Sequence, residues 1–123
     1  MGRKGFSLVE LLVVFSLIFA FSAGIATVFS SVSRQLALRN TAETLAIEIR
    51  AVQSRARLEH QTCFFDAGAK PMPQGIKIAA AHVFSFAASG FPLPGGSGTL
   101  TLQNSAGERK NVIVSSIGRV RVE

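Results

Sequence analysis

The sequence has few of the residues that stabilise small domains through cross-links. Cys63 is the only cysteine among 123 residues, which excludes an intrachain disulfide framework and a zinc site built on paired cysteines. Tryptophan and tyrosine are absent, and no proline occurs before Pro71. Ten phenylalanines and 48% hydrophobic residues nevertheless exclude a chain that is disordered by composition. The length predicts one small domain at most.

Acidic residues are also few, and the apolar residues are unevenly distributed. Seven Asp and Glu stand against 13 Lys and Arg, which gives a formal net charge of +6. Residues 6–33 contain 19 apolar residues in 28 positions, and Leu11–Ser33 carries no formal charge. Because a helix of about 20 residues crosses the apolar layer of a bilayer, the pattern predicts a membrane-spanning helix. A conventional cleaved secretory signal is disfavoured, since no small-residue cleavage site ends the run.

Glu10 is an unusual residue inside this apolar stretch. A carboxylate at the centre of a bilayer costs roughly 2.5–3.5 kcal/mol or more. One interpretation is that Glu10 lies near the membrane edge and stays hydrated. The other is that it has a cationic partner, because a buried charge is tolerated mainly when it is paired.

Residues 4–13, with the sequence Lys-Gly-Phe-Ser-Leu-Val-Glu-Leu-Leu-Val, resemble the class III signal of type IV pilins and type II secretion pseudopilins. The resemblance implies that a prepilin peptidase cuts between Gly5 and Phe6 and that the new N-terminal Phe6 is methylated. It also implies a partner for Glu10, namely the new amine of Phe6 on a neighbouring subunit. This pairing would set the axial register of a helical filament.

The resemblance also implies a location and partners. The chain would cross the bacterial inner membrane once, with its N-terminus in the cytoplasm and its head in the periplasm, before entering a periplasmic or cell-surface filament. Its partners would be other pilin or pseudopilin subunits, contacted through the N-terminal helix, and the prepilin peptidase.

The apolar helix is predicted to continue into an amphipathic one, from about Phe6 to about Glu59. Apolar residues recur at spacings of four and three, as one helical stripe: Leu38, Ala42, Leu45, Ile49, Val52 and Ala56. The stripe is expected to pack against the chain's own C-terminal sheet, and a coiled coil is the alternative. Gly24 is interpreted either as a point of local melting or as a small residue for close helix contact.

Short strand-like runs follow from Gln61 onward. They cover Thr62–Asp66, Ile76–Ala81, Val83–Phe86, Thr99–Gln103, Lys110–Ser115 and Arg119–Val122. Asn104–Gly107 is predicted to be a hairpin loop. The predicted fold class is α+β, with a long N-terminal helix and a small, mostly antiparallel β-sheet head packed on its C-terminal half. The expected parts are a cleaved leader (1–5), a transmembrane or filament-core helix (6–33), its amphipathic half (34–60) and the head (61–123).

The C-terminal region adds a narrower resemblance. The strings Phe84-Ser85-Phe86, Gly90-Phe91-Pro92, Gly98–Leu102 and Ser115–Arg121 resemble the minor pseudopilin H subfamily of the general secretion pathway and related minor type IV pilins. The head lacks the cysteine pair of many major pilins, which disfavours a major pilin of that kind.

No constellation of residues predicts catalysis, a cofactor or a metal. His60 and His82 are isolated in the sequence, and His82 is expected to be a surface strand residue rather than a ligand. Cys63 is interpreted as a buried small hydrophobic residue, with pairing between chains as the alternative. The chain is therefore not expected to be an enzyme.

Basic residues near the C-terminus predict a second kind of partner. Arg119 and Arg121 alternate with valines, so both are expected on one face of the last strand, about 6.6 Å apart. Gly118–Arg121 resembles an element of minor pilins that bind DNA for natural transformation, with Arg109 and Lys110 as further contacts. The alternative is a solvated edge strand protected by charge. The two functional hypotheses are thus a structural filament subunit and a DNA-binding minor pilin, and a simple single-pass membrane protein is a third.

Overall fold

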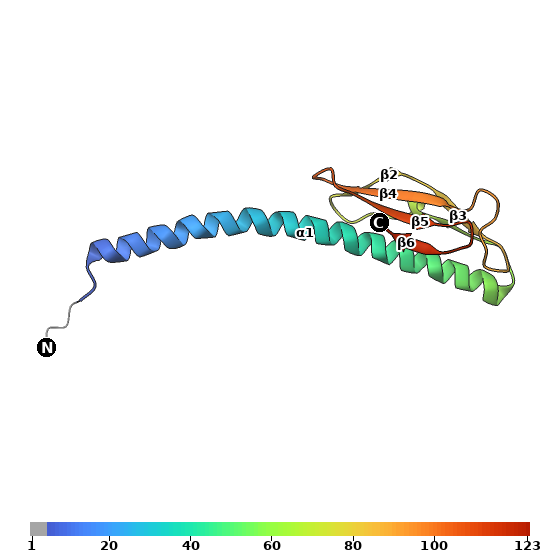
Figure 1. Ribbon diagram of the computed structural model, residues 1–123, viewed down its shortest axis with the longest axis horizontal. Helices are drawn as coiled ribbons and strands as arrows, with labels where there is room; N and C mark the ends of the chain where they lie inside the picture. Colours follow the sequence, from blue (N-terminus) through green and yellow to red (C-terminus); the bar gives the residue numbers. More distant parts are fainter. Residues whose placement is uncertain (1–4) are drawn as a thin grey trace. The chain divides into compact units, whose positions relative to one another are not determined.

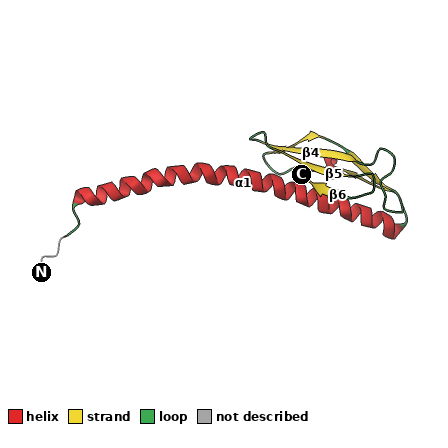
Figure 2. Cartoon of the chain, viewed as in Figure 1, coloured by secondary structure: helices red, strands yellow, loops and turns green. Residues whose placement is uncertain are grey.

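The computed structural model describes residues 5–123, so the basic leader residues Arg3 and Lys4 lie outside the described part. One helix, α1 (Leu8–Glu59), is followed by strands and one short 3-10 helix (Figures 1 and 2). The strands are β1 (Cys63–Asp66), β2 (Ile76–Ala80), β3 (Val83–Phe86), β4 (Gly98–Asn104), β5 (Arg109–Val114) and β6 (Val120–Val122), with the 3-10 helix at Ala67–Ala69. The predicted α+β class is confirmed. The chain divides into two units, one ending at Ser33 and one running from Arg34 to Glu123.

The ends of α1 follow from local backbone hydrogen bonding. At the start, the Ser7 carbonyl accepts a hydrogen bond from the Leu11 amide at 3.1 Å, so the helix begins two residues after the expected Phe6. At the end, His60 adopts a left-handed conformation with φ of 52°, and the Gln61 amide donates to the Ala56 carbonyl at 3.2 Å. This arrangement is the Schellman motif, which satisfies a carbonyl in the last turn and stops the helix.

The core of the second unit lies between α1 and the strands. All sixteen buried apolar side chains of the described residues fall between Leu38 and Val120. The face contributed by α1 consists of Leu38, Ala42, Leu45, Ala46, Ile49 and Ala56, with Val52 partly buried beside them. The expectation that the stripe packs within its own chain is confirmed. Because residues 34–123 contain all of these side chains and form one compact unit, we expect a fragment of these residues to fold on its own.

The strands form two antiparallel sheets rather than one. The larger has the order β2-β4-β5-β6, and the smaller pairs β1 with β3. In β4, Leu100 and Leu102 share the buried face, as the alternation predicted. The predicted hairpin loop joins β4 to β5, and the Asn104 side-chain oxygen accepts from the amides of Ala106 and Glu108 at 3.0 Å each.

Two residues differ from their expected environments. His82 precedes β3 instead of lying on a strand surface, and it is half-buried, with its ring 4.9 Å from that of Phe84. Gly98 lies so close to the His82 ring that an added Cβ would be 2.5 Å from Nε2. Cys63 is partly buried against the core and is not cross-linked. The expectation that His82 is a surface strand residue is therefore wrong, because Phe84 and Gly98 enclose the ring.

Gln53 joins α1 to two distant loops. Its Nε2 donates to the Gly90 carbonyl at 2.8 Å and to the Gly118 carbonyl at 3.1 Å. Both glycines have φ of +82°, a conformation that disfavours other residues. A Cβ on Gly118 would also lie 2.6 Å from the same Nε2, and one on Gly90 would overlap the side chain of Arg57. The glycines thus allow both loops to approach α1 closely.

Replacing Gln53 with alanine is expected to lower the free energy of unfolding of residues 34–123 by about 1–3 kcal/mol, because two half-buried carbonyls lose their donor. Urea-induced unfolding of the fragment measures this change. Gln35→Ala is the matched control, since Gln35 is an exposed glutamine of the same helix and its loss is expected to change stability by less than about 0.5 kcal/mol. Equal stabilities of the two variants would show that the Gln53 contacts contribute nothing.

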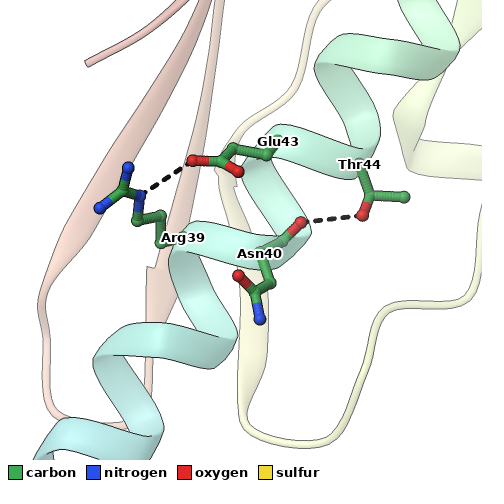
Figure 3. A network of polar contacts seen from close by, with 4 residues as sticks. All are labelled: Arg39, Asn40, Glu43 and Thr44. Atoms are coloured by element: carbon green, nitrogen blue, oxygen red, sulfur yellow. Dashed lines mark hydrogen bonds and ion pairs between the residues drawn. The ribbon is translucent and has the colours of Figure 1, made fainter.

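On the exposed face of α1, polar contacts join residues one helical turn apart. Arg39 Nε contacts Glu43 Oε1 at 2.9 Å, and the Thr44 hydroxyl donates to the Asn40 carbonyl at 2.8 Å (Figure 3). Both partners of the ion pair are at least half exposed, so the pair contributes at most about 0.5 kcal/mol. These contacts support the helix and do not define a binding site.

Candidate functional site

The segment before α1 presents the residues singled out by the N-terminal motif. Gly5 and Phe6 precede the helix, and the Phe6 side chain is 78% exposed. Within residues 5–123, no atom outside its immediate neighbours lies within 4 Å of the position of a Cβ on Gly5. The backbone around the Gly5–Phe6 bond is therefore open on the side where glycine lacks a side chain.

Glu10 lies in the first turn of α1 and is exposed. The amide groups of a first turn give the helix N-terminus a partial positive charge, which favours a carboxylate there. Among residues 5–123 the ion pairs all lie in the second unit, and Glu10 takes part in none of them. Its carboxylate is therefore available to a cation from outside the described chain.

The first unit combines an exposed apolar surface with internally satisfied hydroxyl groups. By length and composition α1 can cross a membrane, and none of its most apolar window is buried. Five hydroxyls donate to carbonyls three or four residues earlier, at 2.8–2.9 Å: Ser16, Ser22, Thr27, Ser30 and Ser31. Since polar groups in a hydrocarbon layer need partners, these bonds make the segment compatible with such a layer.

The four basic residues predicted to contact DNA do not all lie on one face of the larger sheet. Arg119 lies just before β6 and Arg121 within it, and both are exposed on either side of the buried Val120. Arg121 Nη1 lies 3.7 Å from Glu123 Oε1, so an acidic group partly neutralises it.

The two basic residues of β5 point to opposite sides of the larger sheet. Strand alternation puts Lys110 on the same face as the buried Val112 and Val114, whereas Arg109 is on the opposite face with Ile113, which pairs with Arg121. Arg109 and Arg121 thus share the outer face, and Lys110 is separated from them by the sheet. The DNA hypothesis remains a prediction from the sequence.

The described residues contain no cluster of side chains that could hold a metal ion. Between Gly5 and Glu123 no three His, Cys, Asp or Glu side chains gather as metal ligands. The residues that the sequence interpretation missed are Arg50 and Gln53, which bind the backbone of β6 and of the two loops. The sequence signal for Gln53 was the pair of glycines, Gly90 and Gly118, whose carbonyls it binds, and Arg50, which binds the Val120 carbonyl, had no such signal.

Comparison with known proteins identifies the N-terminal segment. Residues 1–26 match the family described as the prokaryotic N-terminal methylation motif. No curated protein and no solved structure matches the chain. The match supports a precursor of the type IV pilin superfamily, points to a structural subunit rather than an enzyme, and implies assembly with other pilin subunits after processing by a prepilin peptidase. Membrane anchoring through the apolar part of α1 is consistent with it.

Proposed function

We propose that this chain is a minor pilin or pseudopilin, a structural subunit of a type II secretion pseudopilus or a type IV pilus. The observation that carries the proposal is the match of residues 1–26 to the methylation motif, together with the open Gly5–Phe6 bond ahead of α1. Prepilin peptidase cuts this bond and methylates Phe6. The apolar part of α1 holds the subunit in the inner membrane until it enters the filament.

Assembly depends on the charge that processing creates. Cleavage exposes an amine on Phe6, a cation that the uncut precursor lacks at this position. Glu10, which has no ion pair within residues 5–123, binds this amine on a neighbouring subunit. Two opposite charges in an apolar surrounding are tolerated when they pair. The pairing therefore fixes the axial offset between neighbouring subunits at the value that brings the Glu10 carboxylate to the Phe6 amine.

The narrower assignment is to the minor pseudopilin H subfamily and related minor type IV pilins. It rests on the C-terminal strings containing Gly90-Phe91-Pro92 and Gly118-Arg119. In the structure, the first glycine of each string has a φ of +82°, and its carbonyl accepts a hydrogen bond from Gln53. The second unit then presents the sheets to partner subunits.

Replacing Gly5 with leucine is expected to block leader removal in cells that express the prepilin peptidase. A side chain at the bond being cut displaces the backbone, and a misplacement of about 1 Å costs on the order of a hundredfold in rate. Mass spectrometry of the membrane-extracted protein measures the loss of residues 1–5 and the methylation of Phe6. Gly2→Leu, in the same leader, is the control and should be processed like the natural sequence. Normal processing of Gly5→Leu would contradict the proposal.

A further inference from the structure

The end of the larger sheet where β4 turns into β5 contains a polar surface pocket that the proposed function does not use. The pocket has a volume of about 350 Å³ and is lined by Gly75, Lys77, Gln103, Asn104, Ser105 and Gly107. The loop before β2 and the β4–β5 turn face each other across it, since a Cβ on Gly75 would lie 3.9 Å from Ser105 Oγ. Small-molecule sites have volumes of about 300–1,000 Å³, so the pocket is large enough for a small ligand.

The strand register brings three hydrogen-bond donors into one row across the outer face of the sheet. Lys77 of β2 lies opposite Gln103 of β4, and Gln103 lies opposite Arg109 of β5, with the three strands side by side (Figure 1). Opposite residues of antiparallel strands share a face and have Cα atoms about 5 Å apart. Lys77 and Arg109 therefore flank Gln103 at about 10 Å from each other. Arg109 is not a lining residue, but the register places it beside the pocket.

The positive charge at this pocket has no counter-charge in the described part of the chain. Lys77 and Arg109 are exposed, and neither takes part in any of the ion pairs found among residues 5–123. No acidic side chain belongs to the lining that the described residues form. Glu108, the acidic residue of the hairpin, instead accepts a hydrogen bond from Asn104 Nδ2 at 2.6 Å. The pocket thus favours an anion.

Two neutral donors belong to the same pocket. Gln103 Nε2 donates to the Gly107 carbonyl at 3.5 Å, a length at which a hydrogen bond is weak, so a ligand can take the place of this carbonyl. The Ser105 hydroxyl is exposed in the turn and lines the pocket beside it. An anion bound here is therefore offered an amide and a hydroxyl in addition to two cations.

We propose that the pocket binds a phosphate group, either as free phosphate or as the phosphate of a small organic molecule. Lys77 and Arg109 hold it from two sides, and Gln103 and Ser105 donate between them. Hydrogen bonds from Lys and Arg to phosphate are about twice as strong as those between neutral groups. The tetrahedral oxygens of a phosphate can accept from all four side chains at once, whereas a planar carboxylate has two oxygens. The site lies outside residues 1–26, so it does not depend on the proposed function.

The test uses the full chain in a nonionic detergent that contains no phosphate. Nuclear magnetic resonance follows the backbone amides while inorganic phosphate, glycerol 3-phosphate or acetate is added at constant ionic strength. We expect saturable shifts at residues 75–77 and 103–109, a Kd of about 1 mM or lower for at least one phosphate, and at least about tenfold weaker binding of acetate. Equal binding of the two phosphates would identify the phosphate group itself as the ligand, and tighter binding of glycerol 3-phosphate would identify an organic phosphate.

Charge-neutral variants separate this site from general attraction to a basic protein. Lys77→Gln and Arg109→Gln are each expected to weaken phosphate binding at least about tenfold, because each removes a charge-assisted hydrogen bond. Both residues are exposed, so the fold should tolerate the changes. Arg119→Gln is the matched control, because it removes the same charge from an exposed residue just before β6. It should bind phosphate as the natural sequence does.

Four results would overturn the proposal. They are no saturable shift at the pocket up to about 10 mM of either phosphate, equal binding of acetate, unchanged binding by Lys77→Gln, and a loss in Arg119→Gln as large as that in Lys77→Gln. Leader removal is measured separately by mass spectrometry, so a failure of phosphate binding leaves the processing test of the proposed function unaffected.

Discussion

Replacing Phe84 with alanine is expected to lower the free energy of unfolding of residues 34–123 by about 3–5 kcal/mol. Phe84 is fully buried in β3, opposite the buried Phe65, and its ring packs 4.9 Å from that of His82. Alanine would leave a cavity in the core of the second unit. Since domains of this size are stable by only about 5–15 kcal/mol, the loss is a large fraction of the total. Urea-induced unfolding measures it.

Two further variants make the Phe84 result interpretable. Phe84→Leu retains most of the volume and is expected to cost clearly less, so it remains measurable if the alanine variant does not fold. Phe91→Ala removes a phenylalanine that is 54% exposed in the loop after β3, and a cost below about 1 kcal/mol is expected. Similar losses for Phe84→Ala and Phe91→Ala would mean that the small sheet is not part of the core.

Replacing Glu10 with glutamine is expected to leave processing intact and to remove the subunit from filaments. Under the proposed pairing, glutamine leaves the amine of Phe6 on the neighbouring subunit without a counter-charge in an apolar surrounding. Breaking such a pair costs about 3–5 kcal/mol, which is more than a hundredfold in association. Quantitative immunoblotting of sheared filaments against the membrane fraction measures incorporation.

The matched control for Glu10 is Glu43→Gln. Glu43 pairs with Arg39 at the surface, where both side chains are at least half exposed, so its loss is expected to change little. Normal incorporation of the Glu10→Gln subunit would refute the pairing with Phe6. Reduced incorporation of the Glu43→Gln subunit would show instead that assembly responds to any loss of negative charge on α1.

The elements that could be predicted from the sequence are those with a local signal. The stripe from Leu38 to Ala56 repeats with the helical period, and it forms the face of α1 that packs on the sheets. The β4–β5 hairpin follows from Asn104 and Gly107, because the asparagine side chain organises the turn and glycine accepts its positive φ of 87°. At the N-terminus, residues 1–26 contain a motif that is readable from sequence alone.

What could not be predicted depends on contacts between distant segments. Alternation within β1 and β3 gives no indication that they pair with each other and leave the other four strands as a separate sheet. Alternation alone puts Lys110 and Arg109 on opposite faces of β5, but which of them shares a face with Arg121 depends on the pairing of β5 with β6. Gln53 is one polar residue among many on α1, and only the positions of Gly90 and Gly118 reveal its contacts.

The Gln53 contacts have a consequence for folding kinetics. They join residues 37 and 65 positions apart in the chain, so both loops must close before the amide can bind them. We therefore expect these hydrogen bonds to form after the transition state for folding, and their removal to speed unfolding while leaving the folding rate nearly unchanged. This one amide then controls how long the folded unit persists, rather than how quickly it forms.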